Sequence, residues 1–159
     1  MQNYRFLRLS ILCIIAFLSA WAGHASYQYM NNPLLQYSGV WEGKGSFNVE
    51  GKEINSSATM LIGNDIRLSL NNSYQNDNFT VDATLVVKRH EHENSHLDLE
   101  NKQVNGLEAF IKKTGINIPL NGTLIDANAW QVDDGNLFLD AQLSNGTSTS
   151  YYLRRKSNR

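Results

Sequence analysis

Three histidines stand close together in the chain and are the side chains best suited to bind a metal ion. They lie in the stretch RHEHENSH, at His90, His92 and His96. In a strand His90 and His92 would point to the same side, and His96 could return to them across a hairpin, a donor set suited to zinc, copper or nickel. No neighbouring residue resembles the second layer of partners that fixes such ligands. We therefore predict a hydrated hairpin tip with no metal and no other cofactor, and keep the three histidines as the alternative.

Residues for nucleophilic catalysis are sparse. The chain contains no Gly-x-Ser-x-Gly elbow, and its one cysteine, Cys13, lies near the N-terminus. The acidic pair Asp133 and Asp134 precedes a glycine, and acidic residues are common in such turns without a catalytic role. A glycosidase carboxylate pair has no fixed spacing in a sequence and stays open. We predict a protein that binds rather than an enzyme.

The N-terminus has the order of a secretory signal peptide. Arg5 and Arg8 come first, an apolar run from Leu9 to Leu18 follows, and small residues end the stretch at Ala25. The apolar run is shorter than the roughly 20 residues that cross a bilayer. We predict cleavage after Ala25, with Ala22 as the second choice, so that residues 1–25 are the leader and residues 26–159 a single domain. A retained anchor is the alternative.

Composition indicates where such a domain would work. Removal of the leader removes Cys13 and leaves no cysteine, which fits a bacterial periplasm better than a disulfide-dependent secreted domain. Loss of Arg5 and Arg8 also changes the formal net charge from -1 to -3, and an acidic domain is a poor candidate for nucleic acid. We predict a periplasmic protein that is not embedded in the membrane, because its polar faces are rich in Ser, Asn and Lys.

Apolar residues recur at every second position from Gly39 onward, which is typical of half-buried strands. In WEGKGSFNV, for example, Trp41 and Phe47 share one face with two glycines. Turn residues such as Asp134-Gly135 separate the segments. Eight segments have this character: 41–49, 53–62, 65–71, 79–87, 96–100, 116–126, 136–143 and 150–155. We predict an all-β fold, an eight-stranded antiparallel meander closed as a barrel, with a β-sandwich as the alternative.

One segment departs from this period. In NGLEAFIKKTG, Leu107, Phe110 and Ile111 have helical spacing, Asn105 could cap the start, and Gly115 ends the run. The pattern predicts one short helix near residues 107–114. So short a helix persists only if its apolar face packs on something, and we expect it to cover an open end of the barrel.

The opening of the first strand, Gly39-Val40-Trp41, resembles the Gly-x-Trp motif of the calycin superfamily, which includes lipocalins and avidin-like proteins. In that superfamily an arginine of the last strand covers the tryptophan at the closed end of the barrel. The resemblance implies this role for Arg155, or for Arg154 if a bulge intervenes. The helix near residues 107–114 departs from the lipocalin pattern. Gly39, Gly43, Gly45 and Arg155 are thus the predicted structural residues, the glycines letting the strand bend without crowding.

An eight-stranded barrel either fills itself with side chains or holds one small ligand. We predict that it binds a small apolar molecule against large inward residues: Trp41, Phe47, Met60, Leu68, Leu85, Leu139 and Tyr151. The alternative is a protein-binding accessory factor or inhibitor, another exported protein being its partner. It would use a polar loop at residues 71–78 and the aromatic approach at residues 26–37.

Overall fold

The computed structural model describes residues 2–31, 33–91, 94–118, 126–142 and 148–156 of the chain. It divides the chain into two compact units, Met1–Pro33 and Leu34–Arg159. The first unit contains helix α1, Gln2–Asn31. Its apolar side chains from Ile11 to Leu18 are largely exposed. Among the described residues, no helix combines the length and the apolarity that crossing a membrane takes.

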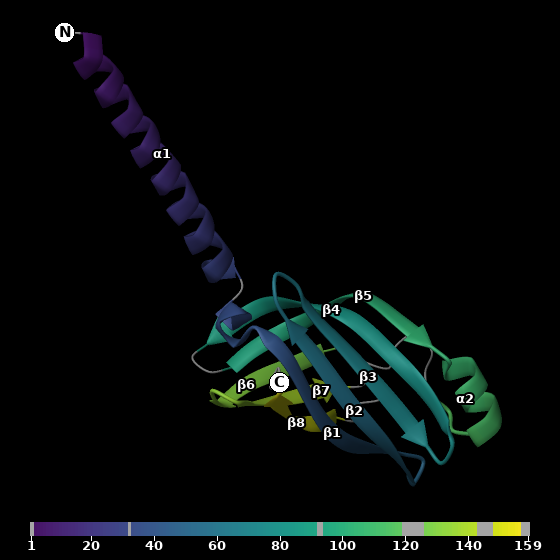
Figure 1. Ribbon diagram of the computed structural model, residues 1–159. Coiled ribbons are helices and arrows are strands. Elements are labelled where there is room, and N and C mark those ends of the chain that lie inside the picture. The colour runs from purple at the N-terminus through teal and green to yellow at the C-terminus, as the bar shows by residue number, and fades with distance from the viewer. Residues whose placement is uncertain (1, 32, 92–93, 119–125, 143–147, 157–159) are drawn as a thin grey trace. The chain divides into compact units, whose positions relative to one another are not determined.

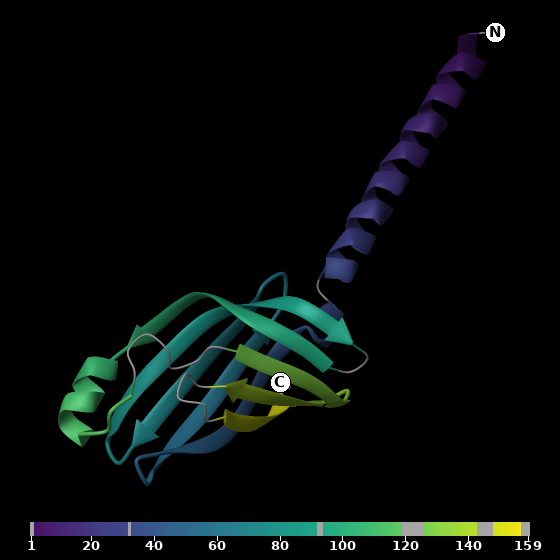
Figure 2. The ribbon, with the colours of Figure 1, turned by 180° about the vertical axis from the view of Figure 1, so that it is seen from behind.

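The second unit is a closed antiparallel barrel in which each strand pairs with the next along the chain (Figures 1 and 2). A short 3-10 helix, η1 at Pro33–Tyr37, leads into it. The strands are β1 Gly39–Val49, β2 Lys52–Ile62, β3 Ile66–Tyr74, β4 Asp77–Glu91, β5 Asn94–Asn105, β6 Asp126–Asp133, β7 Asn136–Gln142 and β8 Ser148–Arg155. The predicted eight-stranded meander barrel is therefore confirmed, and the sandwich is not observed.

The paired stretches that join neighbouring strands, which we call seams, differ in length. The β1 to β2 pairing runs along both whole strands, from Gly39 opposite Ile62 to Val49 opposite Lys52. The pairing of β5 with β6 runs only from Asn94 opposite Trp130 to Leu97 opposite Ala127. The seam that closes the barrel consists of Trp41 opposite Arg155 and Glu42 opposite Arg154. Among the described residues, the meander β6 to β8 is thus joined to the five-stranded sheet β1 to β5 by two short seams.

The predicted short helix is confirmed as α2, Leu107–Thr114, and ends at Gly115 as expected. Its predicted cap is wrong: Gly106, with a positive φ, occupies the N-cap position, because Asn105 is the last residue of β5. Phe110 packs edge-on against Phe79 of β4, with ring centroids 4.9 Å apart. Lys113 pairs with Asp77, and Lys52 donates to the Thr114 carbonyl. These contacts hold α2 at the barrel end that carries the β1–β2 and β3–β4 turns (Figure 1).

Two segment predictions are wrong. The sixth strand is Asp126–Asp133 rather than residues 116–126, because small residues, Ala127 and Ala129, face the core there and give a weak apolar signal. Ile116 and Ile118 are buried without strand structure, and residues 119–125 lie outside the described residues. The polar loop expected at residues 71–78 is instead a tight turn at Gln75 and Asn76 between β3 and β4.

Candidate functional site

The seven predicted ligand-binding residues all line the barrel interior. Each is at most 6% exposed, and all belong to one hydrophobic core. They come from six different strands, which the barrel brings around one axis: Trp41, Phe47, Met60, Leu68, Leu85, Leu139 and Tyr151. The alternation of side chains along each strand is enough to place them there.

One end of the interior is closed around Trp41. The Trp41 indole N–H donates to the Tyr37 carbonyl at 2.8 Å, and the Arg155 guanidinium lies 5.7 Å from the centre of the indole ring. Arg155 also donates to the Ser38 carbonyl. A Cβ on Gly39 would lie 3.1 Å from Arg155 Nε, and its φ of 142° favours glycine. These contacts therefore hold the end of β8 against the start of β1.

Gly43 and Gly45 do not leave empty space in the interior. A Cβ on Gly43 would lie 2.5 Å from the Tyr152 carbonyl oxygen, and one on Gly45 would lie 2.7 Å from the Ser150 carbonyl oxygen. Both distances are well inside van der Waals contact. The two glycines therefore let β1 pass against the backbone of β8, where a side chain would force the strands apart.

A polar chain crosses the interior on the side of Gly45. Ser56 Oγ donates to Asn72 Oδ1 at 2.6 Å, and it lies 2.7 Å from the Tyr151 hydroxyl. Because serine has one hydroxyl hydrogen, which goes to Asn72, the Tyr151 hydroxyl must donate to Ser56. The three residues, from β8, β2 and β3, are each at most 3% exposed. We call Tyr151, Ser56 and Asn72 the interior polar chain.

Thr149 lies beside this chain. It faces inward two residues before Tyr151, and a Cβ on Gly45 would lie 3.1 Å from the side chains of both. Thr149 is 2% exposed, and its Oγ1 has no hydrogen-bond partner among the described residues. A buried hydroxyl without a partner destabilises a fold by about 1–3 kcal/mol. Thr149 Oγ1 is therefore a buried oxygen that could form a hydrogen bond to a polar atom of another molecule.

The pKa of Tyr151 reflects its surroundings. Burial raises the pKa of Tyr151 to about 12, and the hydrogen bond to Ser56 offsets part of the rise. The phenol is therefore neutral at physiological pH and acts as a hydrogen-bond donor, not as a base.

The two described histidines of the hairpin tip point away from each other. His90 Nδ1 lies 2.7 Å from Ser95 Oγ, and Ser95 is fully buried. His96 Nδ1 lies 3.0 Å from Asn128 Oδ1 on the opposite face of the sheet, because successive residues of a strand alternate sides. Among the described residues no group of metal-binding side chains gathers. His92 lies outside the described residues.

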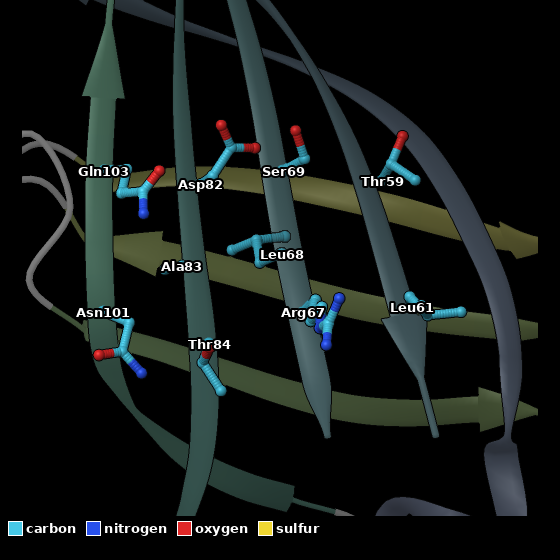
Figure 3. Close-up of a pocket in the computed structure, with 10 residues that line it drawn as sticks. All are labelled: Thr59, Leu61, Arg67, Leu68, Ser69, Asp82, Ala83, Thr84, Asn101 and Gln103. Atoms are coloured by element: carbon cyan, nitrogen blue, oxygen red, sulfur yellow. The ribbon is translucent and has the colours of Figure 1, made fainter. Parts of the chain in front are cut away.

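The outer surface of β2 to β5 carries a hollow of about 370 Å³ (Figure 3). Four polar residues form one row across the four strands: Thr59, Ser69, Asp82 and Gln103. The next row across β2, β3 and β4 holds Leu61, Arg67 and Thr84, and Asn101 of β5 lies beside it. We call this the outer hollow. The sequence alone does not predict this hollow, because polar residues at alternate positions of a strand are typical of any solvated outer face.

Comparison with known proteins adds little to this geometry. No protein-family model matches the chain, and no curated protein matches it. A redesigned β-barrel is similar over 77% of this chain and 93% of its own, with 10% identity and a TM-score of 0.48. A de novo designed fluorescence-activating β-barrel is similar over 77% of this chain and 97% of its own, with 14% identity and a TM-score of 0.43. The fold assignment rests on the strand pairing described above.

Proposed function

We propose that the protein is an exported binding protein that holds a small, mainly apolar molecule inside its barrel. The observation that carries the proposal is the cluster of buried polar side chains beside Gly45. Buried polar atoms destabilise a core unless they are paired, yet this interior keeps the interior polar chain and the unpaired Thr149 hydroxyl. A bound molecule with a polar atom at this level would pair that hydroxyl.

The same residues indicate the chemistry of the ligand. Asn72 accepts from Ser56 through Oδ1, and among the described residues its two N–H donors have no hydrogen-bond partner, so they could donate to a carbonyl or hydroxyl oxygen. The buried polar residues among the described part of the chain are Ser56, Asn72, Ser95 and Thr149, all neutral. An ionic ligand would therefore be buried without an opposite charge. We infer a neutral ligand with an apolar body and a carbonyl or hydroxyl group.

Short side chains face the interior at the level of this polar cluster, where a ligand body would have to lie. Ala127 and Ala141 pair with each other, and Ala141 also pairs with Thr149. Ala58 faces inward from β2, two residues from Ser56. Large buried side chains lie at both ends of the interior, Trp41 at the closed end and Phe79 with Phe110 at the α2 end. A ligand would therefore lie between these ends, at the level of Thr149.

Export from the cytoplasm and membership of the calycin superfamily are parts of the same proposal. The charged, apolar and small-residue order of residues 1–25 supports a cleaved leader and a periplasmic location. The placement of Arg155 over Trp41, with Gly39 beside it, matches what the Gly-x-Trp resemblance implies for the closed end. Helix α2 between β5 and β6 remains a departure from the lipocalin pattern.

Native mass spectrometry of the protein purified from the periplasm of expressing cells tests the proposal. We expect the mass of residues 26–159 plus a small neutral adduct that is lost on denaturation. Absence of the protein from the periplasmic fraction would contradict export, and a periplasmic chain that still contains Met1 would contradict cleavage of the leader. An adduct-free chain that also fails to bind the neutral apolar dye Nile red would contradict ligand binding.

The substitution Thr149→Val tests the role of the unpaired hydroxyl. Because valine has the same shape without the oxygen, we expect the ligand-free protein to gain about 1 kcal/mol in free energy of unfolding, measured by urea denaturation. Affinity for the copurified ligand should fall. Asn71→Leu, on the outer face of β3, is the control for affinity. A loss of stability in Thr149→Val would show that the hydroxyl is paired within the protein.

A second candidate function is protein binding, which one observation favours. Three aromatic residues form a row on the outer face of β6, β7 and β8: Trp130 pairs with Phe138, and Phe138 pairs with Tyr152. Tyr152 is 44% exposed and the nearby Val132 is 53% exposed. Aromatic side chains are enriched among the residues that dominate protein interfaces. A polypeptide that copurifies with the wild-type chain but not with Tyr152→Ser would favour this function.

A further inference from the structure

Most polar side chains of the outer hollow make no side-chain bond within the described part of the protein; Arg67 is the exception and lies 3.7 Å from the exposed Asp65 carboxylate. Among the described residues, no side-chain hydrogen bond engages the row of Thr59, Ser69, Asp82 and Gln103, and Asn101 and Thr84 are likewise unengaged. Polar side chains beside the hollow do have partners: Asn78 Nδ2 donates to Asn71 Oδ1, and Ser57 Oγ donates to the backbone carbonyl of Asn71. The hollow is therefore the part of this face where donors and acceptors are left available.

The backbone shapes the hollow as well. The pairing of β4 with β5 shifts between Asp82 and Thr84, where β5 has one extra residue. Asn101, in this bulge, has a φ of 50°, a left-handed conformation that few residues other than glycine adopt. A bulge bends its strand and increases the local twist. Short side chains on the neighbouring strands, Ser69 and Thr84 among them, leave the bent surface open.

The lining excludes several classes of ligand. One carboxylate, Asp82, and one guanidinium, Arg67, give the hollow no excess of either charge, so it does not suit a polyanion such as nucleic acid. Leu61 and Leu68 are the two leucines in the lining; Leu68 is buried in the barrel core and Leu61 lies at the rim, so the hollow has apolar surface for the body of a small molecule but no long apolar groove for a lipid chain. An extended peptide would need unpaired backbone groups at a sheet edge, whereas the backbone here lies inside the sheet.

What remains is a neutral molecule with many hydroxyl groups. Carboxylate, amide and hydroxyl side chains can each donate to or accept from such hydroxyls, and Asp82 would form the strongest of these bonds because it is charged. A volume of about 370 Å³ falls at the small end of the pockets that hold small molecules, roughly 300–1,000 Å³. We propose that the outer hollow binds a short neutral glycan of one or two sugar units. This site is independent of the barrel interior.

Amide chemical-shift mapping by NMR tests the proposal on the exported protein. The probes are the neutral disaccharides N,N′-diacetylchitobiose, maltose and cellobiose, titrated separately. We expect at least one of them to cause saturable shifts at Thr59, Ser69, Asp82 and Gln103, with the amides of the interior polar chain unchanged. The absence of saturable shifts with all three, or shifts confined to interior residues, would overturn the proposal.

Two variants sharpen the test. Asp82→Asn keeps the shape of the side chain but removes the charge, and we expect the dissociation constant of the responding disaccharide to rise about tenfold. Asp140→Asn changes a carboxylate on the outer face of β7, on the other side of the barrel, and should leave the constant unchanged. Equal weakening in both variants would show a general charge effect and overturn the site. Urea denaturation of both variants confirms that each is folded.

Discussion

The buried phenol of Tyr151 makes the stability of this barrel depend on pH. Its pKa is raised to about 12 by burial, whereas an ordinary tyrosine in the unfolded chain has a pKa near 10. The folded state therefore holds the proton more tightly than the unfolded state does. The resulting stability is fully present below about pH 10 and is lost as the pH rises toward 12.

We expect the free energy of unfolding of the wild-type protein to fall by roughly 2–3 kcal/mol between pH 10 and pH 12 because of this group, at 1.36 kcal/mol per pKa unit. Tyr151→Phe should flatten that fall, and Tyr152→Phe, on the outer face of the same strand, should leave it in place. Urea denaturation at a series of alkaline pH values measures both slopes. An equal flattening by the two substitutions would mean that burial of Tyr151 is not the cause.

At the scale of the element, the first strand depends on its glycines because it crosses close to the last one. We expect Gly43→Ala to destabilise the protein by about 1–3 kcal/mol, since the added Cβ would meet the Tyr152 carbonyl oxygen at 2.5 Å. Gly63→Ala is the matched control, because the nearest atom to its Cβ would be 3.9 Å away. Thermal denaturation of the two variants separates steric crowding from a general effect of losing glycine.

How far the sequence predicts an element depends on the strength of its apolar pattern. Strands with alternating large residues, such as the one containing Leu68 and Leu70, were placed correctly from sequence. The strand with Ala127 and Ala129 was missed, because alanine is too small to give a clear apolar face. The seven interior residues predicted for ligand binding follow from the same alternation and all lie inside.

Other parts of the candidate sites could not be predicted from sequence. The alternation along each strand predicts inward-facing side chains at Ser56, Asn72 and Thr149. Which of these side chains meet depends on the stagger between strands, which the sequence does not give. The outer hollow depends on the bulge at Asn101, whose positive φ the sequence does not specify. The opposite directions of His90 and His96 follow from the register of the hairpin, which a turn of unknown length leaves open.

We expect closure of the barrel to depend on Arg155. We expect Arg155→Ala to lower the free energy of unfolding by about 1–2 kcal/mol, because it removes both the contact over Trp41 and the bond to Ser38. Arg154→Ala should change it by at most about 0.5 kcal/mol, since that side chain is exposed and lies over the exposed Tyr152 ring. Guanidinium denaturation followed by Trp fluorescence compares them; similar losses would contradict a special role for Arg155.

The two short seams on either side of the β6 to β8 meander make it the part of the barrel that can detach as a unit. Local opening requires the least free energy where the fewest backbone bonds must break. Rupture of the pairing at Asn94–Leu97 and at Trp41–Glu42, together with the side-chain bonds of Tyr151 to Ser56 and Arg155 to Ser38, would free three strands together while the other five kept their pairing. The three strands of the meander would then open together. Their backbone amides would exchange with deuterium as one cooperative group, before those in β2 to β4.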